Sequence, residues 1–182
     1  MERERENGSR RRTIRVLGSI SAMLVVAAAI AVLVSTMWLP IFRAYGKSMS
    51  PTINEGEVFA AAAKPKYKDG DIIALWYENK ILVKRVIATS GQTIDMDKEG
   101  NVYIDGELQS EPYLSEKSYG SCSIHFPVQV PEGAYFVMGD NREISADSRN
   151  SEIGLIRQEQ IAGRAFVKLW PLSKLGKING GK

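Results

Sequence analysis

The hydropathy pattern divides the chain into two unlike parts. No charged residue occurs from Val16 to Phe42, and this segment contains the run AMLVVAAAIAVLVSTMWLP. About 20 apolar residues span the core of a bilayer, so the pattern predicts one N-terminal transmembrane helix over residues 16–42. The alternative is a cleaved secretory signal, whose apolar core is usually shorter, at about 7–15 residues. The length favours an uncleaved anchor.

Beyond the apolar segment, short runs rich in β-branched and aromatic residues alternate with turn residues. The runs lie at residues 57–63, 72–77, 81–88, 92–96, 101–106, 134–138 and 161–170. Strands at this spacing, with almost no helical pattern between them, predict a mainly β domain of antiparallel sheets. Residues 109–131 are polar and irregular, which predicts an insertion or flap over about 100–133.

The chain is therefore expected to have four parts. They are a basic tail over residues 1–15, the anchor over 16–42, a β-rich domain over 43–172 that carries the insertion, and a C-terminal tail over 173–182. The C-terminal tail has no strong strand pattern, and we expect it to be frayed.

The net charge of +3 is confined to the first 15 residues, where six arginines outnumber three glutamates. The rest of the chain carries equal numbers of basic and acidic residues. Basic residues before the apolar segment place the N-terminus in the cytoplasm and the β domain outside. A neutral domain argues against nucleic-acid binding, which needs positive charge on the binding surface. The sequence gives no indication of the oligomeric state.

The chain has one cysteine, Cys122, and one histidine, His125. They supply two ligands where a structural zinc has four, so no metal site is predicted, and no cofactor motif occurs. A Ser-His-Asp triad needs a histidine that the fold places beside the serine. Because His125 lies in the irregular segment, a serine hydrolase built on this sequence is expected to use another base.

Lys84 is a candidate for that base. In the run ILVKRVIA, the strand period of two places Leu82, Lys84 and Val86 on one face and Val83, Arg85 and Ile87 on the other. Burial can lower the pKa of a lysine by up to about 3–5 units, which yields a neutral amine near physiological pH. The alternative is a buried stem whose ammonium reaches water or pairs with a carboxylate, and for an isolated lysine it is the commoner arrangement.

Two polar stretches complete the candidate chemistry. The sequence SMSPT, from Ser48 to Thr52, follows the apolar segment closely and is either a turn or the site of a nucleophile. The sequence MGDNREISADSR follows an apolar strand and mixes acids, arginines and hydroxyls. Within it, Asp147 and Arg149 are placed to pair, and Ser145 is placed to bond a neighbouring amine. Taken alone, such a stretch is more typical of a well-bonded loop.

The order of these stretches is more specific than any one of them. An apolar anchor is followed by SMSPT, GDIIAL, VKRVIATSGQ and GDNREISADSR. This order resembles the bacterial type I signal peptidases, membrane-anchored serine proteases with a Ser-Lys dyad, in the short single-anchor form common in Gram-positive bacteria. The resemblance covers about Arg43 to Pro171 and the anchor. It implies that Ser48 is the nucleophile, Lys84 the general base, and Ser145 the group that orients the lysine amine.

The resemblance also assigns supporting roles. It implies that Asp147 and Arg149 hold the last motif in place, and that the backbone N–H of Ser48 binds the oxyanion. Structural or site-shaping roles fall to Met49, Pro51, Arg85, Gly139, Asp140, Asn141 and Arg142. The chain departs from relatives at Gly46, where some carry a serine that helps to bind the oxyanion. It also departs at Glu143-Ile144, where we expect altered loop bonding and an unaltered dyad.

The family resemblance implies removal of signal peptides from exported preproteins, after small residues such as Ala-x-Ala, without a metal or cofactor. Ser48 lies within about 20 Å of Phe42 even in an extended chain, so the nucleophile is expected close to the lipid bilayer. One alternative is the self-cleaving repressors of the DNA-damage response, which are cytoplasmic and carry a DNA-binding helical domain. Another is an anchored extracytoplasmic β-domain that only binds peptides or cell-wall components.

Overall fold

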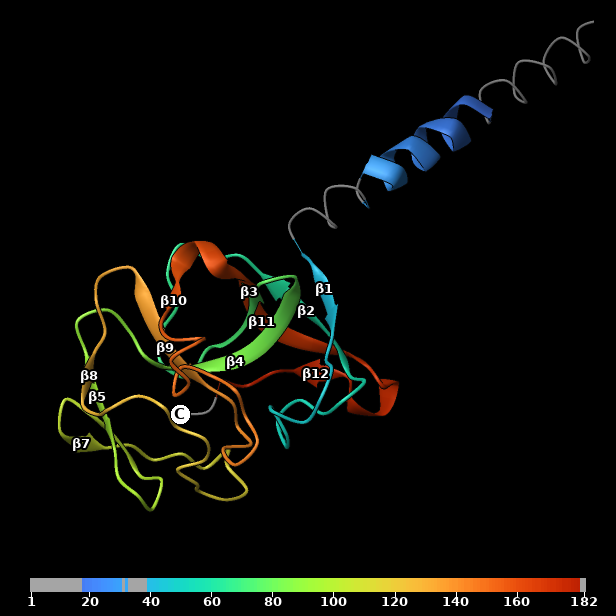
Figure 1. Ribbon diagram of the computed structural model, residues 1–182. Helices are drawn as coiled ribbons and strands as arrows, with labels where there is room; N and C mark the ends of the chain where they lie inside the picture. The colour runs from blue at the N-terminus through green and yellow to red at the C-terminus, as the bar shows by residue number, and fades with distance from the viewer. Residues whose placement is uncertain (1–17, 31, 33–38, 181–182) are drawn as a thin grey trace, which may run out of the picture. The chain divides into compact units, whose positions relative to one another are not determined.

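The computed structural model describes residues 18–30, 32 and 39–180 (Figure 1). Residues 18–30 are helical, and residues 39–180 form a separate unit that contains every strand of the described chain. Within these ranges, no helix has both the length and the hydropathy of a membrane span. The predicted basic tail lies outside the described residues, as do residues 16–17, 31 and 33–38 of the predicted anchor.

The larger sheet has the strand order β1-β2-β11-β3-β4-β9-β10, and β12 pairs with β11. Every pairing in it is antiparallel. Its strands are β1 (Ile41–Arg43), β2 (Val58–Ala62), β3 (Ile72–Tyr77), β4 (Lys80–Ala88), β9 (Ala134–Met138), β10 (Ile156–Arg157), β11 (Ile161–Trp170) and β12 (Gly176–Lys177). Two short 3-10 helices, η1 (Gln158–Gln160) and η2 (Leu172–Lys174), flank β11.

A smaller antiparallel sheet has the order β7-β6-β5-β8. Its strands are β5 (Thr93–Met96), β6 (Val102–Ile104), β7 (Glu107–Leu108) and β8 (Val128–Gln129). In Figure 1 this sheet lies at the left, away from β1, β2 and β12 at the right. The segment expected as an insertion, about 100–133, supplies β6, β7 and β8, whereas β5 precedes it.

The prediction of a mainly β, antiparallel fold is confirmed. Each run predicted as a strand forms one, and residues 109–127, between β7 and β8, form none. The last residues of the apolar segment belong to strand β1. In this strand Ile41 and Phe42 pair with Ala60 and Phe59 of β2.

The C-terminal segment differs from the expectation of a frayed tail. Strand β12 pairs with β11, and the backbone N–H of Ile178 donates to the carbonyl of Phe166 at 3.0 Å. The side chain of Ile178 is buried against the core, with a residue exposure of 9%. A two-residue strand followed by one isoleucine gives no periodic pattern, which explains why the sequence did not reveal it.

Strand β4 crosses the core. Leu82 and Val86 pack in one apolar cluster with Ile73 of β3, Val83 packs in a second cluster, and Ile87 packs in a third. The alternation expected for this strand is therefore present. Lys84 lies directly opposite Ile73 and between Leu82 and Val86, among apolar side chains.

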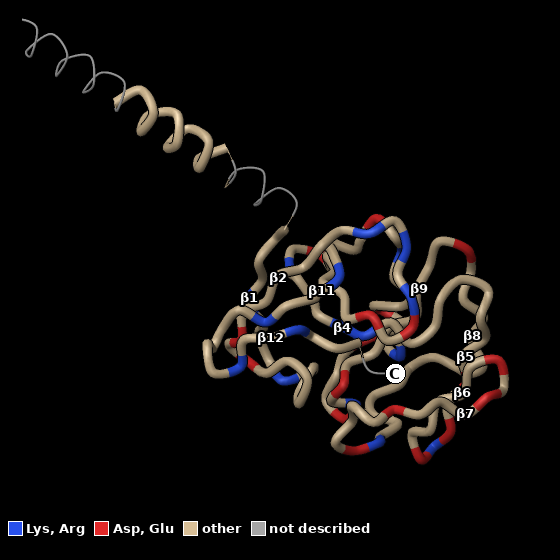
Figure 2. The backbone as a smooth tube through the Cα atoms, turned by 180° about the vertical axis from the view of Figure 1, so that it is seen from behind, with Lys and Arg blue, Asp and Glu red and all other residues tan. Residues whose placement is uncertain are grey.

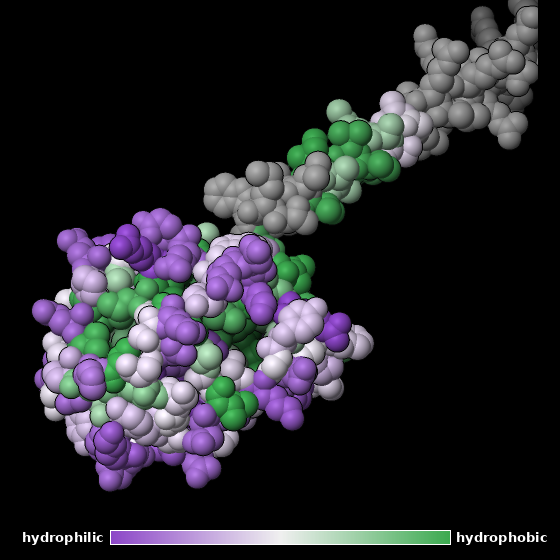
Figure 3. All heavy atoms as spheres, viewed as in Figure 1, coloured by the Kyte–Doolittle hydropathy of each residue, from purple (hydrophilic) through white to green (hydrophobic). Residues whose placement is uncertain are grey.

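Both basic and acidic positions occur along the backbone of residues 39–180 in the view from behind (Figure 2). Around β5, β6, β7 and β8 the charged positions are mostly acidic. In the opposite view, hydrophilic residues cover much of the face, with hydrophobic residues visible between them (Figure 3).

Candidate active site

Ser48 and Lys84 meet although 36 residues separate them. Ser48 begins a tight turn after β1, in which the backbone N–H of Ser50 donates to the carbonyl of Lys47 at 3.1 Å. Lys84 lies in the middle of β4. Its Nζ is 2.9 Å from Ser48 Oγ, within hydrogen-bonding distance. This is the separation that proton transfer from a hydroxyl to an amine requires.

The environment of Lys84 favours the neutral amine. The residue is 3% exposed, and burial lowers the pKa of its side chain from 10.5 to about 8. The negative charge of Asp147 opposes this effect and the positive charge of Arg149 adds to it. Because Lys84 is almost fully buried, its side-chain nitrogen does not reach water. Among the described residues no carboxylate forms an ion pair with it, so neither form of the alternative arrangement is present.

Asp147 and Arg149 form the buried pair that the sequence suggested. Arg149 Nε and Nη2 donate to the two oxygens of Asp147, each at 2.9 Å, and both side chains are 0% exposed. Arg149 also donates to the carbonyls of Tyr119 and Arg142, at 2.9 Å and 2.8 Å. Burial alone would raise the pKa of Asp147, but the hydrogen bonds and charge of Arg149 hold this pKa below its usual range.

The loop after β9 contacts Ser48 through its backbone. The N–H of Asn141 donates to the carbonyl of Ser48 at 3.0 Å, and the N–H of Gly139 donates to Asp147 Oδ2 at 3.0 Å. A side chain at position 139 would collide with the carbonyl oxygen of Ser48 and with the side chain of Ser145. Glycine at this position lets the loop approach the turn, because it has no Cβ.

Ser145 lies in this loop but does not make the contact expected of it. The residue is 2% exposed, and no hydrogen bond joins its Oγ to Lys84 among the described residues; its hydroxyl instead interacts with Asp147 and helps to lower the pKa of that carboxyl. The role of Ser145 in orienting the lysine amine stays a prediction.

Arg85, next to Lys84, organises a second buried ion pair. Its Nε and Nη2 donate to the carboxylate of Asp140 at 2.8 Å and 2.7 Å, and its Nη1 donates to the carbonyl of Gly70 at 3.0 Å. Its guanidinium also stacks on the ring of Tyr113, 3.7 Å from the centroid. Thr52, four residues after Ser48, donates its hydroxyl hydrogen to Asp140. The pair thus joins β4 to the turn that carries Ser48.

Arg142 is held by a residue that the sequence analysis missed. Its guanidinium makes two hydrogen bonds to the carboxylate of Glu111, and its Nε donates to the carbonyl of Gly139 at 3.1 Å. Glu111 is 8% exposed and lies in the segment expected as a polar flap. No local signal marks Glu111 or Thr52, because each partner lies more than 30 residues away in the sequence.

Comparison with known proteins adds to this geometry. The family model described as signal peptidase, peptidase S26, matches residues 17–170. The chain belongs to this family. A signal peptidase I from Bacillus licheniformis is 36% identical, over 86% of this chain and 90% of its own. Signal peptidase I T from Bacillus subtilis (strain 168) is 37% identical, over 84% of each chain.

A solved structure of a signal peptidase I from Enterococcus faecalis V583 is 31% identical, with a TM-score of 0.47, over 54% of this chain and 96% of that chain. The family and its curated members confirm the prediction that the chain is an enzyme, a serine hydrolase of the type I signal peptidase class.

The remaining residues predicted for this peptidase S26 site differ in their surroundings. Met49 is 3% exposed and packs into the core, whereas Pro51 is exposed at the edge of a cavity of about 620 Å³ that Asn141 also lines. Of the two departures in the last motif, Glu143 accepts a hydrogen bond from Ser118, and Ile144 is 58% exposed.

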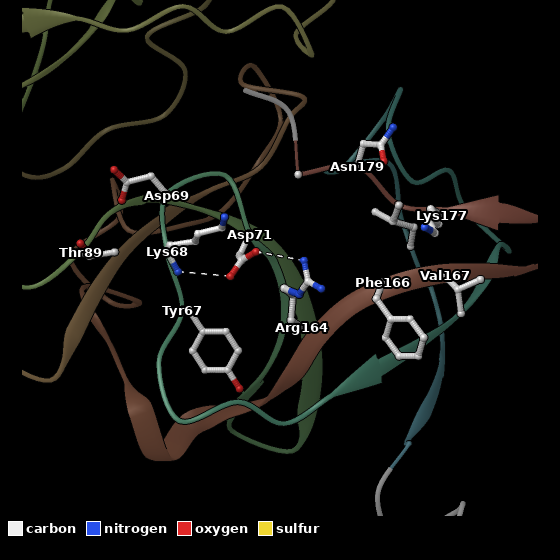
Figure 4. A pocket seen from close by; sticks show the side chains of 12 residues that line it. Tyr67, Lys68, Asp69, Asp71, Thr89, Arg164, Phe166, Val167, Lys177 and Asn179 are labelled. Carbon is white, nitrogen blue, oxygen red and sulfur yellow. Dashed lines mark hydrogen bonds and ion pairs between the residues drawn. The ribbon is translucent and has the colours of Figure 1, made fainter.

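Two further features of this peptidase S26 chain do not involve Ser48 or Lys84. A cavity of about 1080 Å³ is lined by residues that include Tyr67, Phe166 and the ion pair of Asp71 with Arg164, and its lining contains neither Ser48 nor Lys84 (Figure 4). The one histidine, His125, is exposed.

Proposed function

We propose that the chain is a membrane-anchored serine endopeptidase that removes N-terminal signal peptides from exported preproteins, cutting after small residues such as Ala-x-Ala. The observation that carries this proposal is the 2.9 Å contact between Ser48 Oγ and the buried Lys84 Nζ. Membership of the peptidase S26 family supports the substrate class.

Neutral Lys84 accepts the proton of Ser48 as the serine oxygen attacks the scissile carbonyl. The resulting ammonium then protonates the leaving amine, so that the peptide bond breaks and an acyl ester forms on Ser48. Lys84, neutral again, deprotonates a water molecule that hydrolyses the ester. The ammonium formed in this second step protonates Ser48 Oγ as the ester breaks and the acid product leaves, so a proton from water replaces the one that Ser48 gave to the amine.

The oxyanion of each tetrahedral intermediate needs a hydrogen-bond donor. The backbone N–H of Ser48 fills this role in the proposal, and it donates to no acceptor among the described residues. Gly46 carries no hydroxyl, so a second donor of that kind is not available from this position. Ser145 would restrict the rotation of the lysine amine once it forms a hydrogen bond with it.

The topology that we propose places residues 1–15 in the cytoplasm and residues 16–42 in the bilayer. The domain over 43–172, with its C-terminal extension, then lies on the extracytoplasmic side. The charge pattern of the N-terminal segment supports this orientation. It brings Ser48 close to the membrane surface, where the cleavage site of a signal peptide emerges.

Cleavage of a preprotein with an Ala-x-Ala signal by the full-length protein in detergent tests the proposal. We expect wild type to cut after the second alanine, as mapped by mass spectrometry, and Ser48→Ala to leave the preprotein intact. Cleavage by Ser48→Ala would exclude this serine as the nucleophile. A folded wild-type protein that binds the preprotein without cutting it would favour the binding-domain alternative.

Activity should depend on pH through Lys84. Because the pKa of its amine is lowered to about 8, the fraction of neutral base, and with it kcat/KM, should rise as the pH rises through about 8 and level off above it. A profile of kcat/KM against pH, in buffers of constant ionic strength, measures this midpoint. A profile that is level between pH 6 and 10 would contradict the assignment of Lys84 as the base.

A further inference from the structure

Glu57 and Lys168 form a buried ion pair that the mechanism above does not use. Glu57 lies immediately before β2 and is 3% exposed, and the side chain of Lys168, in β11, is 13% exposed. Lys168 Nζ is 2.5 Å from Glu57 Oε2. Because desolvation offsets much of the attraction in a buried ion pair, such a pair is weak support for a purely stabilising role. The hydrogen bonds of this pair instead connect it to the segment that contains Ser48.

Glu57 is the last residue of the segment that carries the proposed nucleophile, residues 47–57, here called the nucleophile turn, and its carboxylate is bonded back onto this segment. The backbone N–H and the side-chain amide of Asn54 donate to Glu57, at 3.1 Å and 3.4 Å. The side-chain oxygen of Asn54 in turn accepts a hydrogen bond from Ser50 Oγ at 3.1 Å. A chain of side-chain contacts therefore runs from Glu57 to within two residues of Ser48.

Lys168 holds the same turn at a second point. Its Nζ donates to the carbonyl of Thr52 at 3.2 Å while it pairs with Glu57, so one ammonium joins two positions of the turn to β11. The hydroxyl of Thr52 is bonded to Asp140, and Asp140 pairs with Arg85, the neighbour of Lys84. Thr52 is thus fixed on one side to the strand of the base and on the other side to β11.

We propose that Glu57 and Lys168 are positioning residues that hold the nucleophile turn so that Ser48 Oγ stays in contact with Lys84. This inference rests on the proposed function, in which Ser48 is the nucleophile. A displacement of about 1 Å between reacting groups can reduce a rate about 10²-fold, so a support of this kind affects catalysis without touching the substrate.

The charge of Glu57 persists under working conditions. Burial alone would raise its pKa, but the hydrogen bonds from Lys168, Asn54 and Lys174 lower it from 4.5 to about 2. The carboxylate is therefore ionised throughout the pH range in which Lys84 is neutral. The stability that it contributes is complete above pH 4.5 and is lost as the pH falls through about 2.

The chain offers a matched control for this pair. Lys174 also pairs with Glu57, at 3.0 Å, but its side chain is 53% exposed and it makes no hydrogen bond to the carbonyl of Thr52. We expect Lys168→Met to lower kcat per active site by about 10-fold to 100-fold, with KM changed by less than about twofold. Lys174→Met should change both constants by less than about twofold. Active sites are titrated with a serine-reactive covalent probe in the full-length protein.

The titration separates positioning from folding. A purely structural role would lower the number of reactive sites and leave kcat per site unchanged, which would overturn the proposal, as would equal effects of Lys168→Met and Lys174→Met. Lys168→Arg retains the charge and the donors and should restore kcat to within about threefold of wild type. If Lys168→Met does not fold, Glu57→Gln keeps the size and the acceptor for Asn54, and it should still lower kcat about threefold to tenfold.

Ser48→Ala distinguishes the failure of this inference from that of the proposed function. If Ser48→Ala is inactive while Lys168→Met matches wild type, only the positioning role is overturned. If Ser48→Ala cleaves the preprotein, the proposed function fails and this inference fails with it.

Discussion

Replacing Lys84 by Met is expected to lower kcat about 10⁴-fold or more and, at the same time, to make the protein more stable near pH 7. The loss of activity follows from removal of the group that accepts the proton of Ser48, since methionine has no basic atom. Cleavage of an Ala-x-Ala preprotein by the full-length variant in detergent, with Ser48→Ala as the inactive reference, measures it.

The gain in stability follows from the lowered pKa of Lys84. A pKa of about 8 in the folded protein against 10.5 for the free group means that burial of the ammonium costs about 3 kcal/mol at pH values below 8. Loss of the hydrogen bond to Ser48 costs about 1 kcal/mol, so the variant should be more stable by about 2 kcal/mol near pH 7. Denaturant unfolding of the full-length protein at a series of pH values measures the difference.

The pH dependence provides the sharpest check on this prediction. Between pH 8 and 10.5 the unfolded wild-type chain binds the proton of Lys84 more tightly than the folded chain, so wild-type stability rises with pH and the advantage of Lys84→Met shrinks. Lys80, exposed at the start of the same strand, serves as the control, and Lys80→Met should alter neither activity nor stability. A less stable Lys84→Met protein near pH 7 would show that the ammonium is not destabilised by burial.

Replacing Arg149 by Met is expected to destabilise the protein by about 3–5 kcal/mol. The arginine is fully buried, and its removal leaves the carboxylate of Asp147 buried without its partner. Because the charge of Arg149 lowers the pKa of Lys84 and that of Asp147 raises it, the midpoint of the activity profile should also move above pH 8. Denaturant unfolding and the kcat/KM profile measure the two effects.

A double variant tests whether the isolated charge is the cause. Asp147→Asn combined with Arg149→Met removes both charges, so it should be less destabilised than Arg149→Met alone. Arg157, an exposed arginine in β10, is the control, and Arg157→Met should change stability by less than about 0.5 kcal/mol. If the double variant is as unstable as the sum of its two single variants, packing and carbonyl contacts of Arg149 account for the loss.

Periodic patterns in the sequence were sufficient to predict most of the strands. The period of two in ILVKRVIA placed Lys84 between Leu82 and Val86, and the structure has all three on one side of β4. Elements without a periodic pattern escaped prediction. Strand β12 and the buried Ile178 are held by pairing with β11. This pairing leaves no periodic hydrophobic pattern in the C-terminal residues themselves.

The sequence by itself determined the β-rich domain, the candidates for nucleophile and base, and the pairing of Asp147 with Arg149, because these depend on local periodicity, on motif order, or on residues two positions apart. Only the tertiary structure decided that Lys84 is buried at 2.9 Å from Ser48, that Ser145 lies beside Asp147 without a hydrogen bond to Lys84, and that Glu57 and Lys168 form an ion pair. Ser48 and Lys84 are 36 positions apart in the sequence, and Thr52 and Lys168 are 116 positions apart. Glu57 and Lys168 are separated by a similar distance in the sequence. A charged side chain whose partner is remote in the sequence carries no local mark of that partner, because the fold alone sets the distance between them.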